Sequence, residues 1–385
     1  MFLLTDDQIR LKNEIRAFVD SEISPVAMEY DRSGRFPLNV INRMKELGYC
    51  SLPFDKELGG AGLGVTEGVI FLEEVSRGLG SIGFTMAAHM LQCCYALQDG
   101  VSPEQKQEWL IPAISCEKLL AFALSEESGG SDVLGISTMA TCKPDCWLLN
   151  GSKCWITNVG VADGYIVGAR TSANSRNRSV SLFYVDSQAE GLEICERDKM
   201  LGLNNSPTGT IIFHNCCIPH TALIGNENEG YQLIKKILKY GRLALSAVAV
   251  GMAQKAMDLA VEFTGRRCSF DRTISSYQGV SFPVAEIYAN ITLTRNMVYH
   301  TADLIGTGRH TSAEIAALKL FSSEMCQEAC KNALMLLGGR GYSKSREIER
   351  LLRDSFALTI AEGTSQICKL IISNAVYNAP PEQFR

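Results

Sequence analysis

Hydrophobic and polar positions divide the chain into three stretches of different period. From Thr5 to about Ile114, apolar residues recur with the 3.6-residue period of an amphipathic α-helix. Two helix starts lie in this stretch: Thr5-Asp-Asp-Gln8 has the pattern of a capping box, and Ser102-Pro-Glu-Gln105 places proline at the first helical position. We therefore expect an N-terminal helical domain over residues 1–118.

The second stretch, residues 119–225, is typical of β-structure. Asn150-Gly151 lies inside the segment from Trp147 to Thr157 and predicts a β-hairpin there, as strand, turn and strand. Further short apolar runs cover Tyr165–Ala169, Val180–Val185, Leu192–Cys195 and Thr210–His214. Several short strands in about 100 residues indicate a small antiparallel barrel or sandwich.

Helical periodicity returns in the third stretch, residues 226–385, with longer segments. We expect helices over Tyr231–Thr264 and Val280–Ile305, and a third that begins at the capping pattern Thr311-Ser-Ala-Glu314. Long neighbouring helices favour a four-helix bundle. The predicted fold class is therefore α+β, with an N-terminal helical domain, a central antiparallel β-barrel or sandwich and a C-terminal four-helix bundle.

Composition excludes several classes of function. The chain has 385 residues and a net charge of −5, which does not suggest a nucleic-acid-binding surface. Its 14 cysteines form no C-x-x-C pair, and the N-terminus lacks a basic segment followed by an apolar one, so we expect reduced thiols and a cytoplasmic location. Charged residues flank the apolar run Leu243–Met252, so no membrane span is expected.

One segment contains residues that could ligate zinc. His214-Asn-Cys216-Cys217-Ile-Pro-His220 brings two histidines and two cysteines close together in the sequence. Adjacent cysteines on a strand point to opposite faces, and the spacing fits no standard zinc site. We therefore expect no metal.

The segment from Ala123 to Gly135, Ala-Leu-Ser-Glu-Glu-Ser-Gly-Gly-Ser-Asp-Val-Leu-Gly, resembles the first signature of the acyl-CoA dehydrogenase family. The resemblance continues through Trp155–Asn158, Arg267–Phe270 with Gln278, Leu337–Tyr342 and Ala361–Ile367, and it covers Thr5 to Asn378. It implies an FAD-dependent enzyme whose helical, β and helical order agrees with the order derived above.

The resemblance implies a flavin site at the start of the β region. In the family, the residues at the positions of Phe122, Leu124 and Ser125 hydrogen-bond the pyrimidine edge of the flavin. The residue at the position of Trp155 forms an apolar wall, and the one at the position of Thr157 hydrogen-bonds near N5. By the same resemblance the cofactor-binding residues also include Gly130, Ser131, Thr364 and Gln366. The protein then supplies orientation and electrostatics, while the cofactor carries the redox chemistry.

Other residues are implied to reach the FAD of a neighbouring subunit. They are Arg267, Ser269, Phe270 and Gln278, with Gly338 and Gly339 allowing close backbone approach. This implies a homotetramer built as a dimer of dimers. The family commonly has a glutamine three residues before the first of these glycines, and Met335 stands there instead, so one cofactor contact is lost or replaced.

Glu362 stands where medium- and short-chain members of the family have the base that removes the α-proton of the acyl thioester. Such a base needs a dry, apolar setting that raises its pKa toward the working pH. Some relatives place the base on the long bundle helix, one residue before an arginine. That position is Gly241, followed by Arg242, so the resemblance assigns the base to Glu362.

Substrate binding is implied for Ser131, Lys239, Arg242, Ala361 and Gly363. Two of these differ from the common pattern: Ala361 replaces a tyrosine over the acyl pocket, and Lys239 replaces an aspartate that holds the pantetheine arm. Lys235, Lys236 and Lys239 share one predicted helix, either as a solvated face or as a docking face for an acidic carrier protein.

The predicted function is FAD-dependent α,β-dehydrogenation of an acyl-CoA thioester, with an electron-transferring flavoprotein as a possible partner. The first alternative is an oxidase or dehydrogenase acting on an acyl group held by an acyl or peptidyl carrier protein in polyketide or nonribosomal biosynthesis. A flavin monooxygenase and a non-catalytic assembly protein on the same fold are further alternatives, and the carboxylate of Glu362 argues against both.

Overall fold

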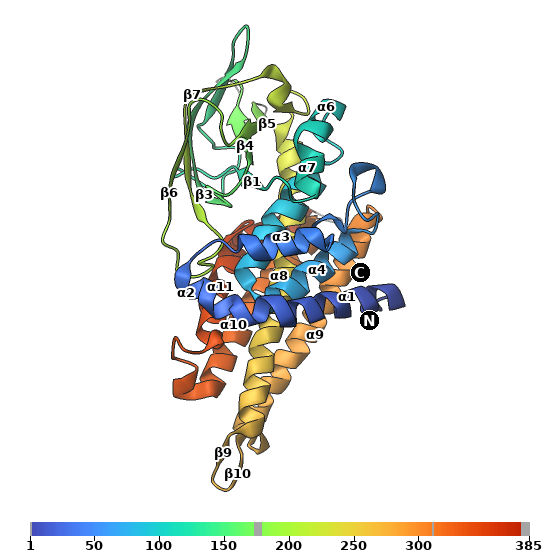
Figure 1. Cartoon of the computed structure of the whole chain (residues 1–385), viewed down its shortest axis with the longest axis vertical. Coiled ribbons are helices and arrows are strands. Elements are labelled where there is room, and N and C mark those ends of the chain that lie inside the picture. The colour runs from blue at the N-terminus through green and yellow to red at the C-terminus, as the bar shows by residue number, and fades with distance from the viewer. Residues whose placement is uncertain (1, 173–178, 310–311, 379–385) are drawn as a thin grey trace.

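The computed structural model describes residues 2–172, 179–309 and 312–378. It has three parts in the predicted order, with helices first, a β-sheet in the middle and a helical bundle last (Figure 1). The predicted fold class is therefore confirmed. Thr311, the predicted cap of one bundle helix, lies outside the described residues.

The N-terminal part is built from short helical segments. Both predicted start signals form complete capping boxes, one at Thr5 with Gln8 and one at Ser102 with Gln105. The segments are α1 (Asp6–Phe18), η1 (Val19–Ile23), η2 (Ser24–Val26), α2 (Ala27–Ser33), α3 (Leu38–Glu46), η3 (Tyr49–Ser51), η4 (Lys56–Leu58), α4 (Val65–Gly78), α5 (Gly80–Met86), η5 (Ala87–Tyr95), α6 (Pro103–Gln105), η6 (Lys106–Leu110) and α7 (Ile111–Ile114).

The central part is one sheet with strand order β6-β7-β3-β2-β4-β5-β8, and β1 pairs with β4. Most pairings are antiparallel, as expected, but β1 and β2 both run parallel to β4. The strands are β1 (Leu120–Ala123), β2 (Met139–Cys142), β3 (Trp147–Thr157), β4 (Gly164–Arg170), β5 (Val180–Asp186), β6 (Leu192–Arg197), β7 (Thr208–Ile218) and β8 (Leu223–Ile224), with η7 (His220–Ala222) before the last.

The hairpin predicted at Asn150-Gly151 is wrong. Trp147–Thr157 is one continuous strand, β3, whose register against β7 shifts between Leu149 and Gly151. Gly151 has φ +139°, and a Cβ there would lie 2.7 Å from the Cα of Thr138. The glycine therefore forms a β-bulge, which bends a strand without ending it.

The C-terminal part is a bundle around the 37-residue helix α8 (Gly230–Arg266). The other elements are β9 (Cys268–Ser269), β10 (Arg272–Thr273), η8 (Ile274–Ser276), α9 (Gln278–Gly306), α10 (Ser312–Leu337), η9 (Gly338–Arg340), α11 (Glu347–Ile360) and α12 (Ser365–Asn378). Helix α8 has an 18-residue window apolar enough to cross a membrane, despite the charges that flank Leu243–Met252. Because 72% of that window is buried inside the chain, we interpret α8 as the core helix of the bundle.

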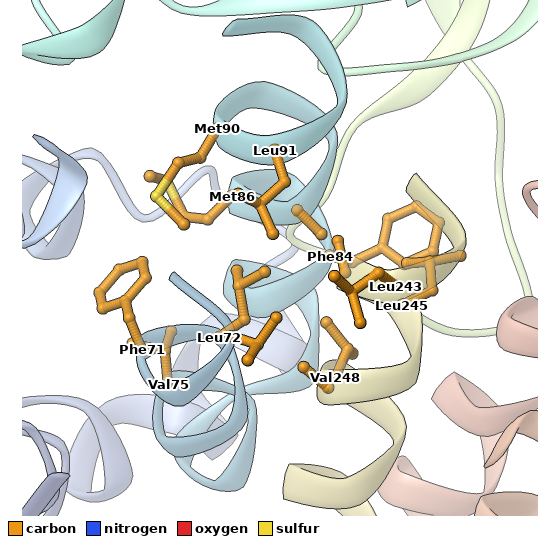
Figure 2. Packing of buried hydrophobic residues seen from close by; sticks show 14 of the residues in the cluster. Phe71, Leu72, Val75, Phe84, Met86, Met90, Leu91, Leu243, Leu245 and Val248 are labelled. Atoms are coloured by element: carbon orange, nitrogen blue, oxygen red, sulfur yellow. The ribbon is translucent and has the colours of Figure 1, made fainter. Parts of the chain in front are cut away.

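The main hydrophobic core joins the N-terminal helices to α8 (Figure 2). Side chains from α4, α5, η5 and α8 meet there, among them Phe71, Leu72, Val75, Phe84, Met90, Leu91, Leu243 and Val248. Burial of such side chains stabilises each by about 1.5–3 kcal/mol relative to exposure. This packing fixes η5, which carries Gln92, against α8.

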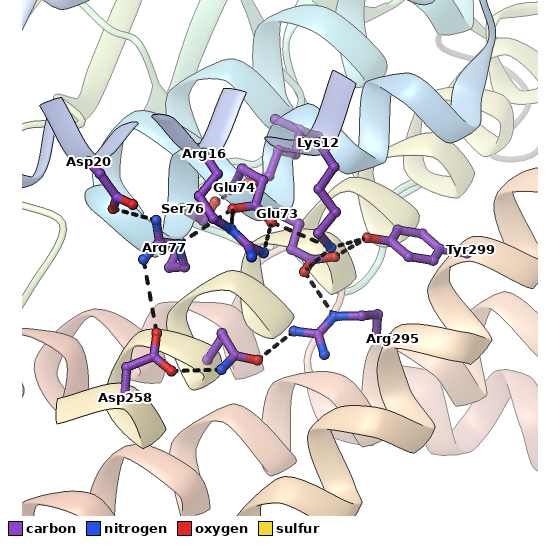
Figure 3. A network of polar contacts seen from close by, with 12 residues as sticks. Lys12, Arg16, Asp20, Glu73, Glu74, Ser76, Arg77, Asp258, Arg295 and Tyr299 are labelled. Carbon is purple, nitrogen blue, oxygen red and sulfur yellow. Dashed lines mark hydrogen bonds and ion pairs between the residues drawn. The ribbon is translucent and has the colours of Figure 1, made fainter. Parts of the chain in front are cut away.

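A buried polar network ties α1 to α4 and α9 (Figure 3). The carboxylate of Glu73 accepts hydrogen bonds from Lys12 Nζ at 2.8 Å, Arg295 Nε at 2.9 Å and the Tyr299 hydroxyl at 2.5 Å. Burial opposes the charge of Glu73, but Lys12 and Arg295 outweigh that effect and lower its pKa to about 2. Because the carboxylate is well satisfied, the network fixes the first helix on the bundle.

The bulge can be tested by Gly151→Ala. The new Cβ would meet Thr138 at a backbone angle that L-residues rarely adopt, so we expect the free energy of unfolding to fall by about 2–4 kcal/mol. Gly306→Ala is the control, because nothing lies within 4 Å of its Cβ position. Denaturant unfolding measures both variants, and equal stability of the two would contradict the bulge.

Candidate active site

A strained turn between α11 and α12 presents Glu362. Glu362 has φ +58° and Gly363 has φ +92°, so two consecutive residues are left-handed. The left-handed region costs an ordinary residue about 1–2 kcal/mol, and such strain persists only where the surroundings determine the conformation. The neighbours of this turn should therefore hold it firmly.

Two buried cations hold the turn through its backbone. Arg242 Nε on α8 donates to the carbonyl oxygen of Glu362 at 3.0 Å, and Lys319 Nζ on α10 donates to that of Gly363 at 2.6 Å. The side chain of Lys319 is fully buried and Arg242 is 9% exposed. Hydrogen bonds from charged donors are stronger than neutral ones, so these two bonds offset the strain.

The two carboxylate oxygens of Glu362 have different surroundings. Oε1 accepts a hydrogen bond from Gln92 Nε2 at 2.7 Å. Oε2 is buried and has no hydrogen-bond partner among the described residues. It lies beside Gly241, where a Cβ would be only 2.4 Å away, so any other residue at 241 would displace the carboxylate.

These surroundings raise the pKa of Glu362 to about 7. Burial is the largest cause, since an ionised carboxylate is poorly solvated there. Arg242, the hydrogen bond from Gln92, and Lys319 act in the opposite direction. The resulting group takes up and releases protons near neutral pH, as a general base requires.

A second buried ion pair shapes the loop after β1. Lys153 Nζ, on β3, lies 2.7 Å from Glu126 Oε1 and also donates to the carbonyl oxygen of Leu124 at 3.0 Å. Glu126 further accepts hydrogen bonds from the backbone N–H groups and hydroxyls of Ser137 and Thr138. Glu126 thus closes the loop that carries the predicted flavin residues.

The predicted flavin residues near the sheet lie on this loop and on β3. Trp155 has φ +56° and is 55% exposed, whereas its neighbour Ile156 is buried. These residues lie on four segments: β1 carries Phe122, the loop after it carries Leu124, Ser125, Gly130 and Ser131, the end of β3 carries Thr157, and the start of α12 carries Gln366, with Thr364 directly before it. An exposed indole next to polar groups fits an isoalloxazine, which needs an apolar wall and hydrogen bonds at its edge.

The remaining predicted cofactor residues lie at the other end of α8. Ser269 and Phe270 belong to the β9–β10 hairpin that projects from the bundle (Figure 1), Arg267 caps the end of α8 directly before it, and Gln278 begins α9. Arg340, next to Gly338 and Gly339, lies over the Phe263 ring near the same end of α8. The 24 residue steps from Arg242 to Arg266 span about 36 Å of helix. One chain therefore does not bring the two groups together.

The predicted substrate residues lie in two places, around Glu362 and α8 and on the loop after β1. Arg242, Ala361 and Gly363 adjoin Glu362, and Lys239 lies on α8 one turn before Arg242. Lys239 Nζ sits 4.8 Å from the centre of the Tyr240 ring, and burial lowers its pKa. Ser131 is exposed on the loop after β1.

Two residues at the site were missed from the sequence, Gln92 and Lys319. Each is a single polar residue inside an apolar helical segment, Met-Leu-Gln-Cys-Cys for the first and Ala-Leu-Lys-Leu-Phe for the second. A buried polar side chain needs a partner, so such isolated residues are a usable signal.

In the segment from His214 to His220, Cys216 is buried and Cys217 exposed, as strand alternation predicts.

The raised pKa of Glu362 predicts a pH-dependent cost to folding. Because the folded pKa of about 7 exceeds the unfolded 4.5, the protein loses stability as pH rises through this interval. Glu362→Gln should therefore be more stable than the wild type at pH 8, by up to about 3 kcal/mol, and nearly equal at pH 4.5. Thermal unfolding at both pH values tests this, with the exposed Glu117→Gln as control, and an equal difference at both would contradict it.

Comparison with known proteins identifies all three parts of the chain. Models of the acyl-CoA dehydrogenase N-terminal, middle and C-terminal domains match residues 5–117, 121–216 and 228–377. The chain is 33% identical over 376 residues to "Acyl-CoA dehydrogenase, short-chain specific" of Clostridium acetobutylicum, covering 98% of this chain and 99% of that protein.

Solved structures give the same result. Butyryl-CoA dehydrogenase from Megasphaera elsdenii matches with a TM-score of 0.95 and 28% identity, covering 98% of this chain and 100% of that one. A chain from the structure of the electron transferring flavoprotein of Acidaminococcus fermentans matches with a TM-score of 0.96 and 32% identity, over 98% and 100% of the two chains. The chain therefore belongs to the acyl-CoA dehydrogenase family of FAD-dependent oxidoreductases, which act on CH–CH groups.

Proposed function

We propose that this protein dehydrogenates an acyl-CoA thioester between the α and β carbons, with Glu362 as the base. The observation that carries the proposal is the buried, unpartnered Oε2 of Glu362, on a carboxyl whose pKa is raised to about 7. An ionised carboxylate with one free oxygen in a dry setting is a strong acceptor for a weakly acidic α-proton. FAD, when bound, supplies the acceptor for the β-hydride.

The turn also provides for the negative charge that develops on the thioester oxygen. Left-handed φ at Glu362 and Gly363 fixes the direction of the backbone N–H of Glu362, which we propose as a donor to that oxygen. Arg242 and Lys319 hold the turn through its carbonyl groups and so keep this N–H in place. These two cations thus act on the reaction through the backbone.

Glu362→Gln tests the base directly. We expect the variant to keep FAD and its visible spectrum, because glutamine has nearly the same shape, and to lose at least about 100-fold in the rate of anaerobic flavin bleaching by acyl-CoA. A panel of acyl-CoAs of increasing length also identifies the substrate. Retention of the wild-type rate would show that another group removes the α-proton.

We further propose that the β9–β10 hairpin completes the FAD site of a second copy, in a homotetramer arranged as a dimer of dimers. Phe270 is 87% exposed at the hairpin tip, and Met335 is 70% exposed near the same end of the bundle. Exposed large apolar residues on a projecting element are typical of an interface. The separation of about 36 Å along α8 supports sharing between subunits, because an extended dinucleotide is shorter than that.

A second candidate substrate is an acyl group on a carrier protein, with Lys239 as the observation in its favour. This lysine stands on α8 one turn before Arg242, which bonds the carbonyl oxygen of Glu362. Of the neighbouring lysines, Lys235 is exposed and Lys236 pairs with Asp99 at 3.0 Å.

An electron-transferring flavoprotein is the proposed electron acceptor for either substrate, by analogy with the Acidaminococcus structure.

Charge reversal separates the two substrates. If an acidic carrier docks on this helix, replacing Lys235, Lys236 and Lys239 by glutamate should raise the apparent KM for the carrier-bound acyl group about 10-fold or more. The KM for the matching acyl-CoA should change much less. The control is Lys143→Glu, which reverses the charge of an exposed lysine between β2 and β3. Equal effects of the triple variant on both substrates would exclude carrier docking.

A further inference from the structure

Gln92 is the only side chain among the described residues that hydrogen-bonds the carboxylate of Glu362. It belongs to η5, a π-helical segment, whereas Glu362 lies 270 residues later in the sequence. Gln92 is 5% exposed, so its amide is held by the core rather than by solvent. Met90 and Leu91, which precede it, are fully buried in the main hydrophobic core (Figure 2).

The bond makes the two oxygens of Glu362 inequivalent. Nε2 of Gln92 binds Oε1 at 2.7 Å, while Oε2 has no partner and points over Gly241. A carboxylate without this bond could rotate about its last torsion and exchange the two oxygens, since that torsion is broad. The amide therefore selects which oxygen stays free.

We propose that Gln92 is a positioning residue that holds Oε1 of Glu362 and thereby dedicates Oε2 to accepting the substrate proton. This inference rests on the proposed role of Glu362 as the base. The amide donates to the ionised form of the carboxyl, so it favours that form over the protonated one. It thus opposes the effect of burial, which alone would keep Glu362 protonated to higher pH.

Other groups near Glu362 must be separated from this effect. Arg242 on α8 and Lys319 on α10 both favour the ionised carboxylate, and each binds the backbone of the turn. Cys93 on η5 is fully buried, and its pKa is raised by burial and by Glu362. The Cys368 thiol on α12 lies 3.8 Å from the carbonyl oxygen of Gly363. None of these donates to Oε1, so a change at Gln92 leaves them in place.

The test is Gln92→Met, which keeps the length of the side chain and removes the donor. Infrared titration of the FAD-loaded protein follows the Glu362 carboxyl band, identified by its loss in Glu362→Gln. We expect the midpoint to rise by about 1 pH unit in Gln92→Met, the shift that loss of one hydrogen bond to a charged group gives. Gln98→Met, the same change farther along the chain, should leave it unmoved. An unmoved midpoint in Gln92→Met would overturn the proposal.

A kinetic readout separates this proposal from the function on which it rests. With butyryl-CoA as the probe, the pH profile of anaerobic flavin bleaching should shift upward by the same amount in Gln92→Met, with a lower rate at pH 7. If the wild type is not bleached by any thioester but the infrared midpoint still shifts, the positioning holds and the proposed function fails. Should Gln92→Met not fold, Gln92→Asn, whose amide is too short to reach Oε1, is expected to give the same shift. Bleaching without any shift in the pH profile would count against the positioning.

Discussion

Everything at the site depends on a turn that the backbone would not adopt alone. Two consecutive left-handed residues, Glu362 and Gly363, are held because α8 and α10 each direct a buried cation at one of their carbonyl groups. Arg242 and Lys319 would themselves be costly to bury without these acceptors. The two hydrogen bonds therefore offset both costs, the strain of the turn and the desolvation of the cations.

The same arrangement leaves the carboxylate of Glu362 only partly satisfied. A fully paired carboxylate would be a stabilising element, as Glu73 is with its three donors, and its pKa would fall. Glu362 has a single donor on one oxygen and a glycine beside the other. The contrast between these two buried glutamates shows how neighbouring cations and hydrogen-bond donors set the pKa of a buried acid.

Local sequence signals predicted the elements well where the signal and the tertiary structure agree. The capping boxes at Thr5 and Ser102 formed because all their partners lie within four residues. The hairpin predicted at Asn150-Gly151 was wrong because turns and bulges favour the same residues. Here β3 pairs with β7 on both sides of Asn150, so the strand continues and the glycine forms a bulge.

The site was less accessible from the sequence. Glu362 was predicted as a site residue through its motif, which lies in one short segment of sequence. Gln92 and Lys319 were not, because their partners lie 270 and 44 residues away and only the packing of η5 and α10 brings them together. An isolated polar residue in an apolar helix indicates that a partner exists, but it does not say which one.

The length of helix α8 limits which changes of sequence the fold can accept. It is continuous from Gly230 to Arg266, so Arg242, which holds the turn at Glu362, and the hairpin at the far end of the helix share one axis. Inserting one residue between Arg242 and Arg266 would rotate the hairpin by about 100° and move it about 1.5 Å along that axis. A substitution in this interval leaves the direction of the hairpin unchanged wherever the new side chain fits, which is not the case at Gly251, where a Cβ would clash with the carbonyl oxygen of Glu73. An insertion or deletion turns the hairpin relative to the turn at Glu362, whichever residue is added or removed. The length of this segment therefore sets the direction of the hairpin, and its composition does not.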